Sequence, residues 1–554
     1  MTITSVYVAN RGEIAKRVAR TCARLGTDAL SADVPSFLDG EALIEQAQAW
    51  GADAVHPGYG FLSENADFAQ AVIDAGLTWI GPSPAAIAAM ARKDKAREIA
   101  EAAGVPVTPR YEPGAIPPDA FPVLVKAAAG GGGKGMHVVR AAGELSDALD
   151  MARREAKAAF GDDTLLIERY VEGGRHVEVQ VFGDVHGGVV HLGTRDCSAQ
   201  RRHQKIVEEA PAPNLPDALR ERLHEAAVSL AKAVDYANAG TVEFLVLGDD
   251  AFLLEMNTRL QVEHPVTEEI TGLDLVEWQL KVAAGERLPL RQDEITFSGH
   301  AVESRVYAED PYHGFLPQAG RAVGVDWPSG DVRVEEDFHD TVSTQFDPMI
   351  AKIITHRPSR AEALAAMRVA LSQTAFYGLT TNVGYLFDVI EAMSRPDVLV
   401  HTGWLEGEGA YLLEPRRTPL VAVADNSPFG AADGWRLAGD PVPALHLPTR
   451  RIGGRLFARD GAHTWEVVEP DPFDRTHGAA ATGDDVTAPM PGTVVAVDVA
   501  EGDIVTAGQR LGALEAMKME LALLAPHDGT VTHVGAAVGG QVTQGQVLVT
   551  VAPA

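Results

Sequence analysis

The sequence predicts a multidomain α/β protein that ends in an all-β unit. With 554 residues the chain is too long for one hydrophobic core, so we expect several domains. Residues 1–90 alternate short apolar runs with amphipathic helical patterns, which predicts a parallel, doubly wound sheet. Residues 486–554 contain a duplicated segment rich in valine and glycine, which predicts a small β-structure made of two similar halves.

The N-terminal domain, residues 1–90, begins with a strand and a helix. Ser5–Ala9 reads as a buried strand, and the amphipathic run Ile14–Leu25 follows it as a helix. Further short strands are predicted at Ala52–His56 and Thr78–Ile80, with a helix at Phe68–Ala75 between them. Strands that alternate with helices in this order form parallel sheets.

The middle of the chain divides into three predicted regions, residues 91–298, 299–410 and 411–474. The first contains a strand at Val123–Ala127, a glycine run, and a hairpin near Thr241–Asn257. The second mixes strands with helices, and the third is richer in Pro and Gly, so we expect only short strands there. Residues 475–485 are small, polar and without periodicity, which is typical of a flexible linker.

The C-terminal duplication aligns APMPGTVVAVDVAEGDIVTAGQRL, starting at Ala488, with APHDGTVTHVGAAVGGQVTQGQVL, starting at Ala525. Matching valines and turn glycines predict two interlocked β-halves related by pseudo-symmetry. Between the copies lies EAMKME, which puts Lys518 at an exposed hairpin tip. Such a lysine is usually a solubilising charge, but here two methionines flank it, and apolar side chains are unusual at an exposed tip.

Composition excludes several classes of protein. The net charge of −30 argues against nucleic-acid binding, which needs a basic surface. No apolar stretch is long enough for a membrane span, and the N-terminus does not resemble a secretory signal. Cys22 and Cys197 are too few and too far apart for a disulfide scaffold or a thiolate metal site. We therefore expect a cytoplasmic protein.

Two segments are candidates for binding a phosphorylated ligand. The run Gly130–Gly133 is followed by Lys134 and Gly135, so it lacks the Ser or Thr of a P-loop. Glycines nevertheless let backbone N–H groups close over a phosphate, and the preceding strand would hold Lys126 nearby. The basic cluster 200–205 could also contact a nucleotide. The alternatives are a flexible glycine loop and a solvated basic loop.

The segment Phe252–His264 places polar residues at every second position. If it is extended, Glu255, Asn257, Arg259, Gln261 and Glu263 face one side. The turn at residues 248–250 would bring Glu243 opposite Glu255, and two carboxylates with an amide suit Mg²⁺. Arg259 and Glu263 could bind and deprotonate a small anion. The alternative is a solvated strand face with alternating charges.

Together these segments resemble the biotin carboxylase family of ATP-grasp enzymes over residues 1–405. The hairpin Ala516–Met519 resembles the biotinyl domain of biotin-dependent carboxylases. A chain that combines a biotin carboxylase with a biotinyl domain is similar to α-subunits of acyl-CoA carboxylases of the acetyl-, propionyl- or methylcrotonoyl-CoA type. The resemblance implies an N-terminal biotin carboxylase domain, an ATP-grasp domain, a biotin carboxylase C-terminal domain, a subunit-contact region and a biotinyl carrier. It rests on residues 8–15, 56–65, 130–136, 175–181, 195–213, 255–268 and 303–311.

The resemblance also implies a role for each matching residue. Glu263 would deprotonate bicarbonate, Arg305 would stabilise the biotin enolate, and Lys518 would carry the biotin. Lys205 and Arg259 complete the catalytic set. The ATP contacts would be Lys93, Lys126, Gly131, Gly132, Gly133, Glu168, His176 and His203, with Lys205. Bicarbonate would be bound by Arg259, Gln261 and Val262, and Mg²⁺ or Mn²⁺ by Glu243, Glu255 and Asn257.

The implied partners are a carboxyltransferase β-subunit and a biotin protein ligase, in a hetero-oligomer that meets acyl-CoA only through the β-subunit. The sequence departs from the family pattern twice. Residues 25–41 are shortened, which predicts either a trimmed N-terminal sheet or segments missing from the given sequence. Residues 415–480 are also shortened, with 433–437 as a remnant of the subunit-contact domain. The remaining alternatives are a urea or pyruvate carboxylase and a biotin carrier without catalytic activity.

Overall fold

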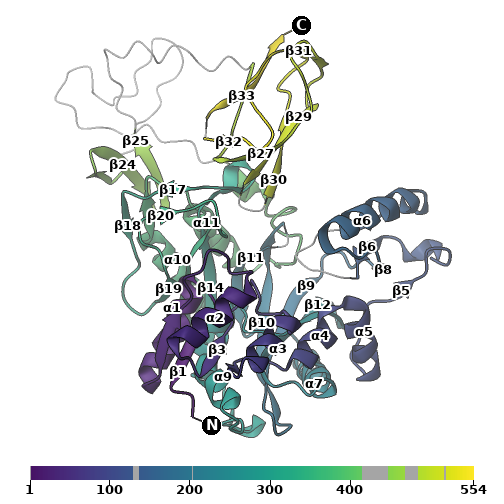
Figure 1. Ribbon diagram of the computed structural model, residues 1–554, viewed down its shortest axis with the longest axis vertical. Coiled ribbons are helices and arrows are strands. Elements are labelled where there is room, and N and C mark those ends of the chain that lie inside the picture. The colour runs from purple at the N-terminus through teal and green to yellow at the C-terminus, as the bar shows by residue number, and fades with distance from the viewer. Residues whose placement is uncertain are drawn as a thin grey trace.

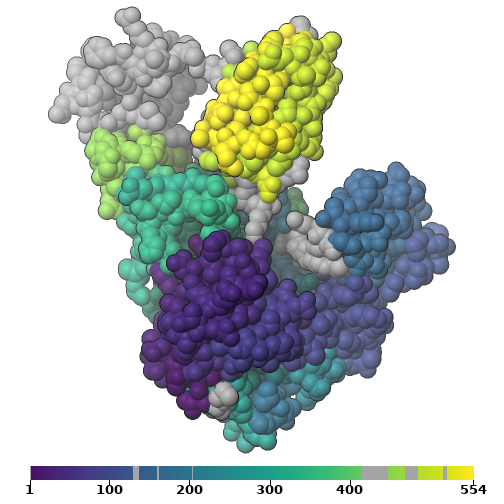
Figure 2. Space-filling view, in the orientation of Figure 1, coloured from purple at the N-terminus to yellow at the C-terminus, as the bar shows by residue number. Residues whose placement is uncertain are grey.

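The computed structural model describes residues 2–128, 136–202, 204–414, 447–467, 484–516, 519–543 and 545–553. The main body contains the N-terminal sheet and a large central sheet, and two smaller units project from it (Figure 1). One projection is a sheet backed by a helix, formed by residues 110–169, and the other is the C-terminal β-domain, residues 485–553 (Figure 2). No helix in the described ranges is both long and apolar enough to cross a membrane.

The N-terminal sheet is parallel and has the order β2-β1-β3-β4. Its strands are Ser5–Val8, Asp28–Ser31, Ala54–His56 and Thr78–Trp79 for β1 to β4. Val6 and Val8 pack with α1 (Gly12–Leu25) on one face, whereas Tyr7 and Val55 pack with α2 (Gly40–Trp50) and α3 (Ala66–Asp74) on the other. Helices on both faces confirm the predicted doubly wound arrangement.

The shortened segment after Leu25 still supplies a strand and a helix, neither of which we predicted from the sequence. The four-residue edge strand β2 pairs with β1, and the Asp39 side chain caps α2 by accepting from the Ala42 N–H at 3.1 Å. Residues 32–39, between this strand and this helix, have no regular structure. The sequence signal was weak because β2 is short and none of its residues is buried.

The central sheet has eight strands in the order β13-β12-β9-β10-β11-β14-β21-β19. It runs without a break from the predicted ATP-grasp region into the following one, because β11 pairs with β14. Its strands are β9 (Arg175–Gly183), β10 (Val189–Arg201), β11 (Gln204–Ala210), β12 (Asn238–Leu247), β13 (Asp250–Asn257), β14 (His300–Tyr307), β19 (Arg333–Glu336) and β21 (Met349–Arg357).

Helices cover the central sheet and bury its apolar side chains in two large clusters and in parts of two others. They are α4 (Pro84–Ala91), α5 (Lys93–Ala102), α7 (Asp217–Ala233), α8 (His264–Thr271), α9 (Leu275–Ala283), α10 (Arg360–Gln373) and α11 (Val383–Met393). Short strand pairs lie at its margin: β15 (Glu309–Asp310) with β16 (Leu316–Pro317), β17 (Gly320–Arg321) with β20 (Thr341–Val342), and β18 (Gly324–Asp326) with β22 (Ala375–Tyr377).

The first projection, which we call the lid sheet, is a four-stranded sheet with its own small core. Its strands are β5 (Arg110–Tyr111), β8 (Leu165–Arg169), β6 (Val123–Ala127) and β7 (His137–Val139), and α6 (Leu145–Phe160) packs against them (Figure 1). The predicted strand Val123–Ala127 is confirmed as β6.

The C-terminal domain confirms the prediction of two interlocked halves. One sheet has the order β26-β33-β31-β28 and the other β30-β29-β27-β32. The short strand of each half, β28 or β32, crosses over to pair with the first strand of the other half. The strands are β26 (Asp485–Thr487), β27 (Gly492–Val497), β28 (Ile504–Val505), β29 (Arg510–Ala516), β30 (Met519–Leu524), β31 (Gly529–Val534), β32 (Gln541–Val542) and β33 (Val547–Pro553).

The turns of the two halves are also equivalent. The Thr506 N–H donates to Gln509 Oε1 at 3.1 Å, and the Thr543 N–H donates to Gln546 Oε1 at the same distance. In the sequence before this domain, the short strands expected there are found. They form a three-stranded sheet of β23 (Thr449–Ile452), β24 (Arg455–Asp460) and β25 (His463–Val467). The remnant at 433–437 lies outside the described residues.

Candidate active site

A cavity of about 510 Å³ lies between the lid sheet and the central sheet. Every predicted site residue that the structure describes lines it, although these residues come from segments far apart in the chain. They are Lys93, Lys126, Glu168, His176, Lys205, Glu243, Glu255, Asn257, Arg259, Gln261, Val262, Glu263 and Arg305. Gly131, Gly132, Gly133, His203 and Lys518 lie outside the described residues.

A row of charged residues crosses four neighbouring strands on one face of the central sheet. Arg195 is opposite Glu178, Glu178 is opposite Glu243, and Glu243 is opposite Glu255. The last pairing confirms the predicted hairpin. Directly opposite residues project from the same face, so three carboxylates lie side by side.

Lys205 neutralises much of this row. Its Nζ donates to Glu178 Oε2 at 2.7 Å, Glu243 Oε1 at 3.0 Å and Glu263 Oε1 at 2.7 Å. Burial alone would lower the pKa of Lys205, but these carboxylates raise it well above its usual value. Lys205 is therefore a charged centre shared by three acids.

Glu263 lies between two cations. Its Oε2 accepts from Arg305 Nη2 at 3.0 Å, and its other oxygen accepts from Lys205. Burial would raise the pKa of Glu263, but Lys205 and Arg305 hold it well below the usual value. The side chain is 1% exposed, so its ionised form depends on these two partners.

The predicted metal ligands meet at the end of β13. Asn257 Nδ2 donates to Glu243 Oε1 at 2.9 Å, and Lys93 Nζ is 3.9 Å from Glu255 Oε2. Burial and the neighbouring Glu243 charge raise the pKa of Glu255. A divalent cation would relieve this repulsion, and two carboxylates with an amide oxygen are suitable ligands for Mg²⁺. The donor set therefore fits the implied metal.

The segment after Asn257 is not the extended strand that the alternation predicted. Strand β13 ends at Asn257, and residues 258–263 form a turn before α8. The turn still directs its side chains into the cavity, because Arg259 donates to Asn257 Oδ1 at 3.0 Å and to Gln261 Oε1 at 2.7 Å. Hydrogen bonds, rather than strand periodicity, bring these residues together.

Glu168 organises the lid side of the cavity. Its carboxylate is paired with Lys126 at 2.8 Å and with Arg97 at 3.2 Å, and it accepts from Thr108 Oγ1 at 2.6 Å. Burial would raise the pKa of Glu168, but Lys126 and these other partners lower it. Glu168 thus fixes Lys126 at the cavity wall.

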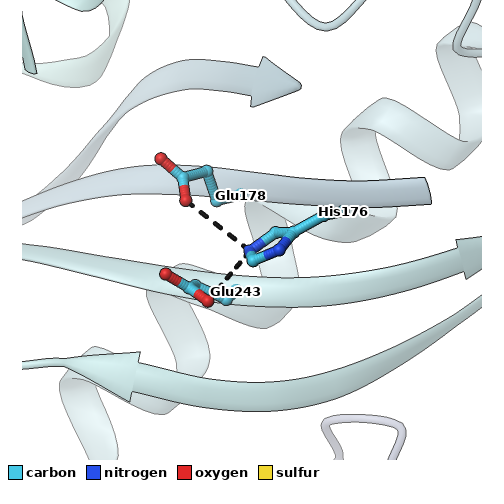
Figure 3. Close-up of side chains that lie close together, drawn as sticks. All are labelled: His176, Glu178 and Glu243. Carbon is cyan, nitrogen blue, oxygen red and sulfur yellow. Dashed lines mark ion pairs between the residues drawn. The ribbon is translucent and has the colours of Figure 1, made fainter. Parts of the chain in front are cut away.

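Sequence reasoning missed Glu178. Figure 3 shows it on the same strand as His176, with Glu243 on the adjacent strand. His176 Nε2 lies 2.9 Å from Glu243 and 3.8 Å from Glu178. Donor atoms of these three residues are close enough to hold a metal ion, and Lys205 donates to both carboxylates. The alternation in RHVEVQV, residues 175–181, was the available signal.

The hairpin expected to carry Lys518 is formed on both sides of it. Strands β29 and β30 pair antiparallel as far as Ala516 and Met519. The residues between them, which include Lys518, lie outside the described ranges.

Four sequence families match consecutive parts of the chain. "Biotin carboxylase, N-terminal domain" matches residues 29–87, and "Carbamoyl-phosphate synthase L chain, ATP binding domain" matches residues 68–291. "Biotin carboxylase C-terminal domain" matches residues 303–407. "Biotin-requiring enzyme" matches residues 484–551, which contain the duplicated β-domain.

Whole-length relatives share this order. The biotin-dependent acyl-coenzyme A carboxylase alpha3 subunit of Mycobacterium leprae is 44% identical, covering 94% of this chain and 93% of the relative. The mouse mitochondrial methylcrotonoyl-CoA carboxylase subunit alpha is 38% identical, covering 95% and 90%. The biotin carboxylase domain of Hydrogenobacter thermophilus 2-oxoglutarate carboxylase, solved with MgADP and bicarbonate, superposes with a TM-score of 0.71 at 38% identity, covering 75% of this chain and all of that one.

Proposed function

The chain belongs to the biotin-dependent acyl-CoA carboxylase α-subunits, which join a biotin carboxylase to a biotinyl domain, and we propose how its residues divide the chemistry. It carboxylates biotin with ATP and bicarbonate. The observation that supports the proposed assignment of roles is that the residues that match the biotin carboxylase pattern line one cavity.

Glu263 is the base in this proposal. Bicarbonate is bound by Arg259, Gln261 and the backbone of Val262, within reach of Glu263. Removal of its proton prepares an oxygen to attack the γ-phosphate of ATP, which gives carboxyphosphate and ADP. In the structure described above Lys205 holds Glu263 at low pKa. When Lys205 moves to the transferred phosphate, Glu263 loses a cationic partner and becomes a stronger base.

The nucleotide is held from both sides of the cavity. Lys93 and Lys126 approach from α5 and the lid sheet, and His176 from the central sheet, while Gly131–Gly133, Glu168 and His203 are proposed to complete the contacts. Glu243, Glu255 and Asn257 would hold Mg²⁺ or Mn²⁺, which would neutralise phosphate charge. Fixed cations aimed at developing charge supply most of the catalysis.

Arg305 serves the second half-reaction. Carboxyphosphate breaks down to CO₂ and phosphate, the phosphate takes the proton of the biotin ureido N–H, and that nitrogen bonds to CO₂. The Arg305 guanidinium would stabilise the enolate form. The biotin is attached to Lys518, which a biotin protein ligase recognises at the hairpin of β29 and β30. The acceptor is thus carried to the cavity by the chain itself.

A β-subunit receives the carboxyl group. We propose that it is a carboxyltransferase, that it alone binds the acyl-CoA, and that the substrate is of the methylcrotonoyl or propionyl type. The location is proposed to be cytoplasmic, with both cysteines free and buried. Cell fractionation tests this, since a relative named above is mitochondrial.

Transfer of radiolabelled bicarbonate onto the biotinylated chain tests the proposal. With ATP and Mg²⁺, wild type should acquire acid-labile protein-bound label, whereas Glu263→Gln and Lys518→Ala should not. Glu277→Gln, a change in α9 outside the cavity lining, is the matched control and should label like wild type. If Lys518→Ala labels normally, the carrier assignment is wrong. If wild type binds biotin but never labels, the chain is a carrier without catalytic activity.

A further inference from the structure

Two buried carboxylates lie behind Arg305 and are not used in the reaction described above. Strand β11 pairs with β14, and Glu208 is directly opposite Glu303. Side chains at such positions share one face of the sheet and are close together. Both residues are 0% exposed. The sheet therefore places two acidic groups side by side, away from water.

Only one oxygen of the pair has a hydrogen-bond partner among the residues that the structure describes. Glu208 Oε1 accepts from Arg305 Nε at 2.5 Å. Glu208 Oε2 and both oxygens of Glu303 have none within that part of the chain. Arg305 also donates to Glu263 at 3.0 Å, so its guanidinium bridges the proposed base and the buried pair.

The surrounding charges cannot neutralise two ionised carboxylates. The groups that face the pair are Arg305 on β14, Lys205 on β11, Cys197 on β10, Lys352 on β21, Glu263 before α8, and Tyr59 with Glu13 from the N-terminal domain. Lys352 Nζ is engaged by Glu13 at 2.9 Å and by the Val262 carbonyl at 2.8 Å. Lys205 is shared by three other acids. Two buried like charges then repel each other strongly.

The pKa values of both carboxyls are raised. Burial raises the pKa of Glu208 to about 7, against the effect of Arg305 and with the help of the Glu263 charge. Burial also raises the pKa of Glu303 well above its usual value, opposed by Lys352 and assisted by Glu208. Raised pKa values agree with the lack of hydrogen-bond partners for Glu208 Oε2 and both Glu303 oxygens, because a buried charge without partners is unfavourable.

We propose that Glu208 and Glu303 are a positioning pair that shares one proton, and that their single negative charge holds the Arg305 guanidinium beside Glu263. The inference rests on the proposed role of Arg305. With one proton, the pair carries the charge needed to orient Arg305. When the proton is lost, a second charge draws Arg305 toward the pair and away from the reacting biotin. Biotin carboxylation then declines as the pH rises.

The pH profile of free-biotin carboxylation tests the pair. Glu303→Gln keeps the shape of a protonated carboxyl but cannot ionise, so kcat near neutral pH should stay close to wild type. The alkaline limb of the pH–activity profile, where activity declines, should shift to higher pH by about one unit or more. Glu208→Gln removes the charge that orients Arg305 and should lower kcat/KM for free biotin by about tenfold or more. Glu303→Met provides the same test of the alkaline limb if the amide folds poorly.

The matched control is Glu209→Gln, which removes a buried carboxylate from the next residue of β11. Glu209 is paired with His300 and Arg360 rather than with Arg305. Its variant should keep the wild-type pH profile, even if it is less stable. An alkaline limb that is the same in wild type, Glu303→Gln and Glu303→Met would overturn the proposal.

Infrared spectroscopy tests the shared proton without reference to activity. The difference spectrum of wild type minus Glu303→Gln at neutral pH should contain a protonated carboxyl band that shifts in heavy water. A difference spectrum without that band overturns the pair. If wild type fails to cleave ATP with bicarbonate, the proposed function fails, but the infrared result still decides whether the pair holds a proton.

Discussion

At the scale of single residues, Lys205 determines the charge of the cavity, because three acids share its ammonium group. Lys205→Met should leave Glu178, Glu243 and Glu263 buried without their common cation. Removing one partner of a buried ion pair costs about 3–5 kcal/mol, so we expect a comparable loss in the free energy of unfolding. Bicarbonate-dependent ATP cleavage should fall by about a hundredfold or more. Denaturant unfolding and an ADP-release assay measure the two effects.

Lys281→Met is the matched control for Lys205→Met. Lys281 pairs with Glu277 on the surface of α9, with 37% of its side chain exposed. Exposed pairs of this kind contribute about 0–1 kcal/mol, so stability and activity should hardly change. If Lys205→Met behaves like Lys281→Met in both assays, the cavity does not depend on the shared cation.

At the scale of elements, Glu335 joins the N-terminal helix α1 to the central sheet. Its carboxylate on β19 is paired with Arg20 of α1 at 2.5 Å and with Arg333 at 2.7 Å. Burial would raise its pKa, but Arg20 and Arg333 lower it to about 2. A depressed pKa stabilises the fold above the unfolded value of 4.5, and this contribution is lost as the pH falls from 4.5 toward about 2.

We therefore expect Glu335→Gln to lower the free energy of unfolding near pH 7 by about 2–3 kcal/mol. The variant should also lose part of the wild-type decrease in stability between pH 4.5 and about 2. Glu336→Gln, a partly exposed neighbour 3.7 Å from Lys16, is the control and should do neither. Equal acid dependence in wild type and Glu335→Gln would show that this ion pair does not couple α1 to the sheet.

The lid sheet is expected to respond to the nucleotide as one element. Its core is small and separate from the large clusters, so it should open locally more often than the central sheet. ATP with Mg²⁺ should slow hydrogen exchange in β6 and β8, because Lys126 and Glu168 line the cavity. Lys126→Met should weaken this protection, whereas β31 and β33 should exchange at the same rate with or without nucleotide. Protection spread equally over both regions would argue against nucleotide binding beneath the lid.

The sequence predicted contacts within a hairpin better than contacts between distant strands. The turn at residues 248–250 was enough to place Glu243 opposite Glu255. Glu178 was missed because its neighbour Glu243 is on a strand 65 positions later, and only the sheet order brings them together. The extent of β13 was overestimated. The alternation of polar and apolar residues continues through 258–263, but the extended backbone ends at Asn257.

At the scale of the whole molecule, the C-terminal domain and the cavity belong to one chain, and the proposed carboxylation of acyl-CoA requires a separate β-subunit. The chain alone should cleave ATP but should not carboxylate acyl-CoA. Adding the carboxyltransferase β-subunit should produce ATP-dependent acyl-CoA carboxylation with wild type, and none with Lys518→Ala. Acyl-CoA carboxylation by the isolated chain would contradict the proposed division between subunits.

The central claim is that one cavity uses ATP and bicarbonate to carboxylate a biotin carried on Lys518. Bicarbonate-dependent ATP cleavage with free biotin tests it most directly, with wild type, Glu263→Gln and Lys518→Ala compared. The account predicts that wild type and Lys518→Ala turn over alike and that Glu263→Gln is inactive. Absence of bicarbonate-dependent cleavage in wild type, or full activity in Glu263→Gln, would contradict it.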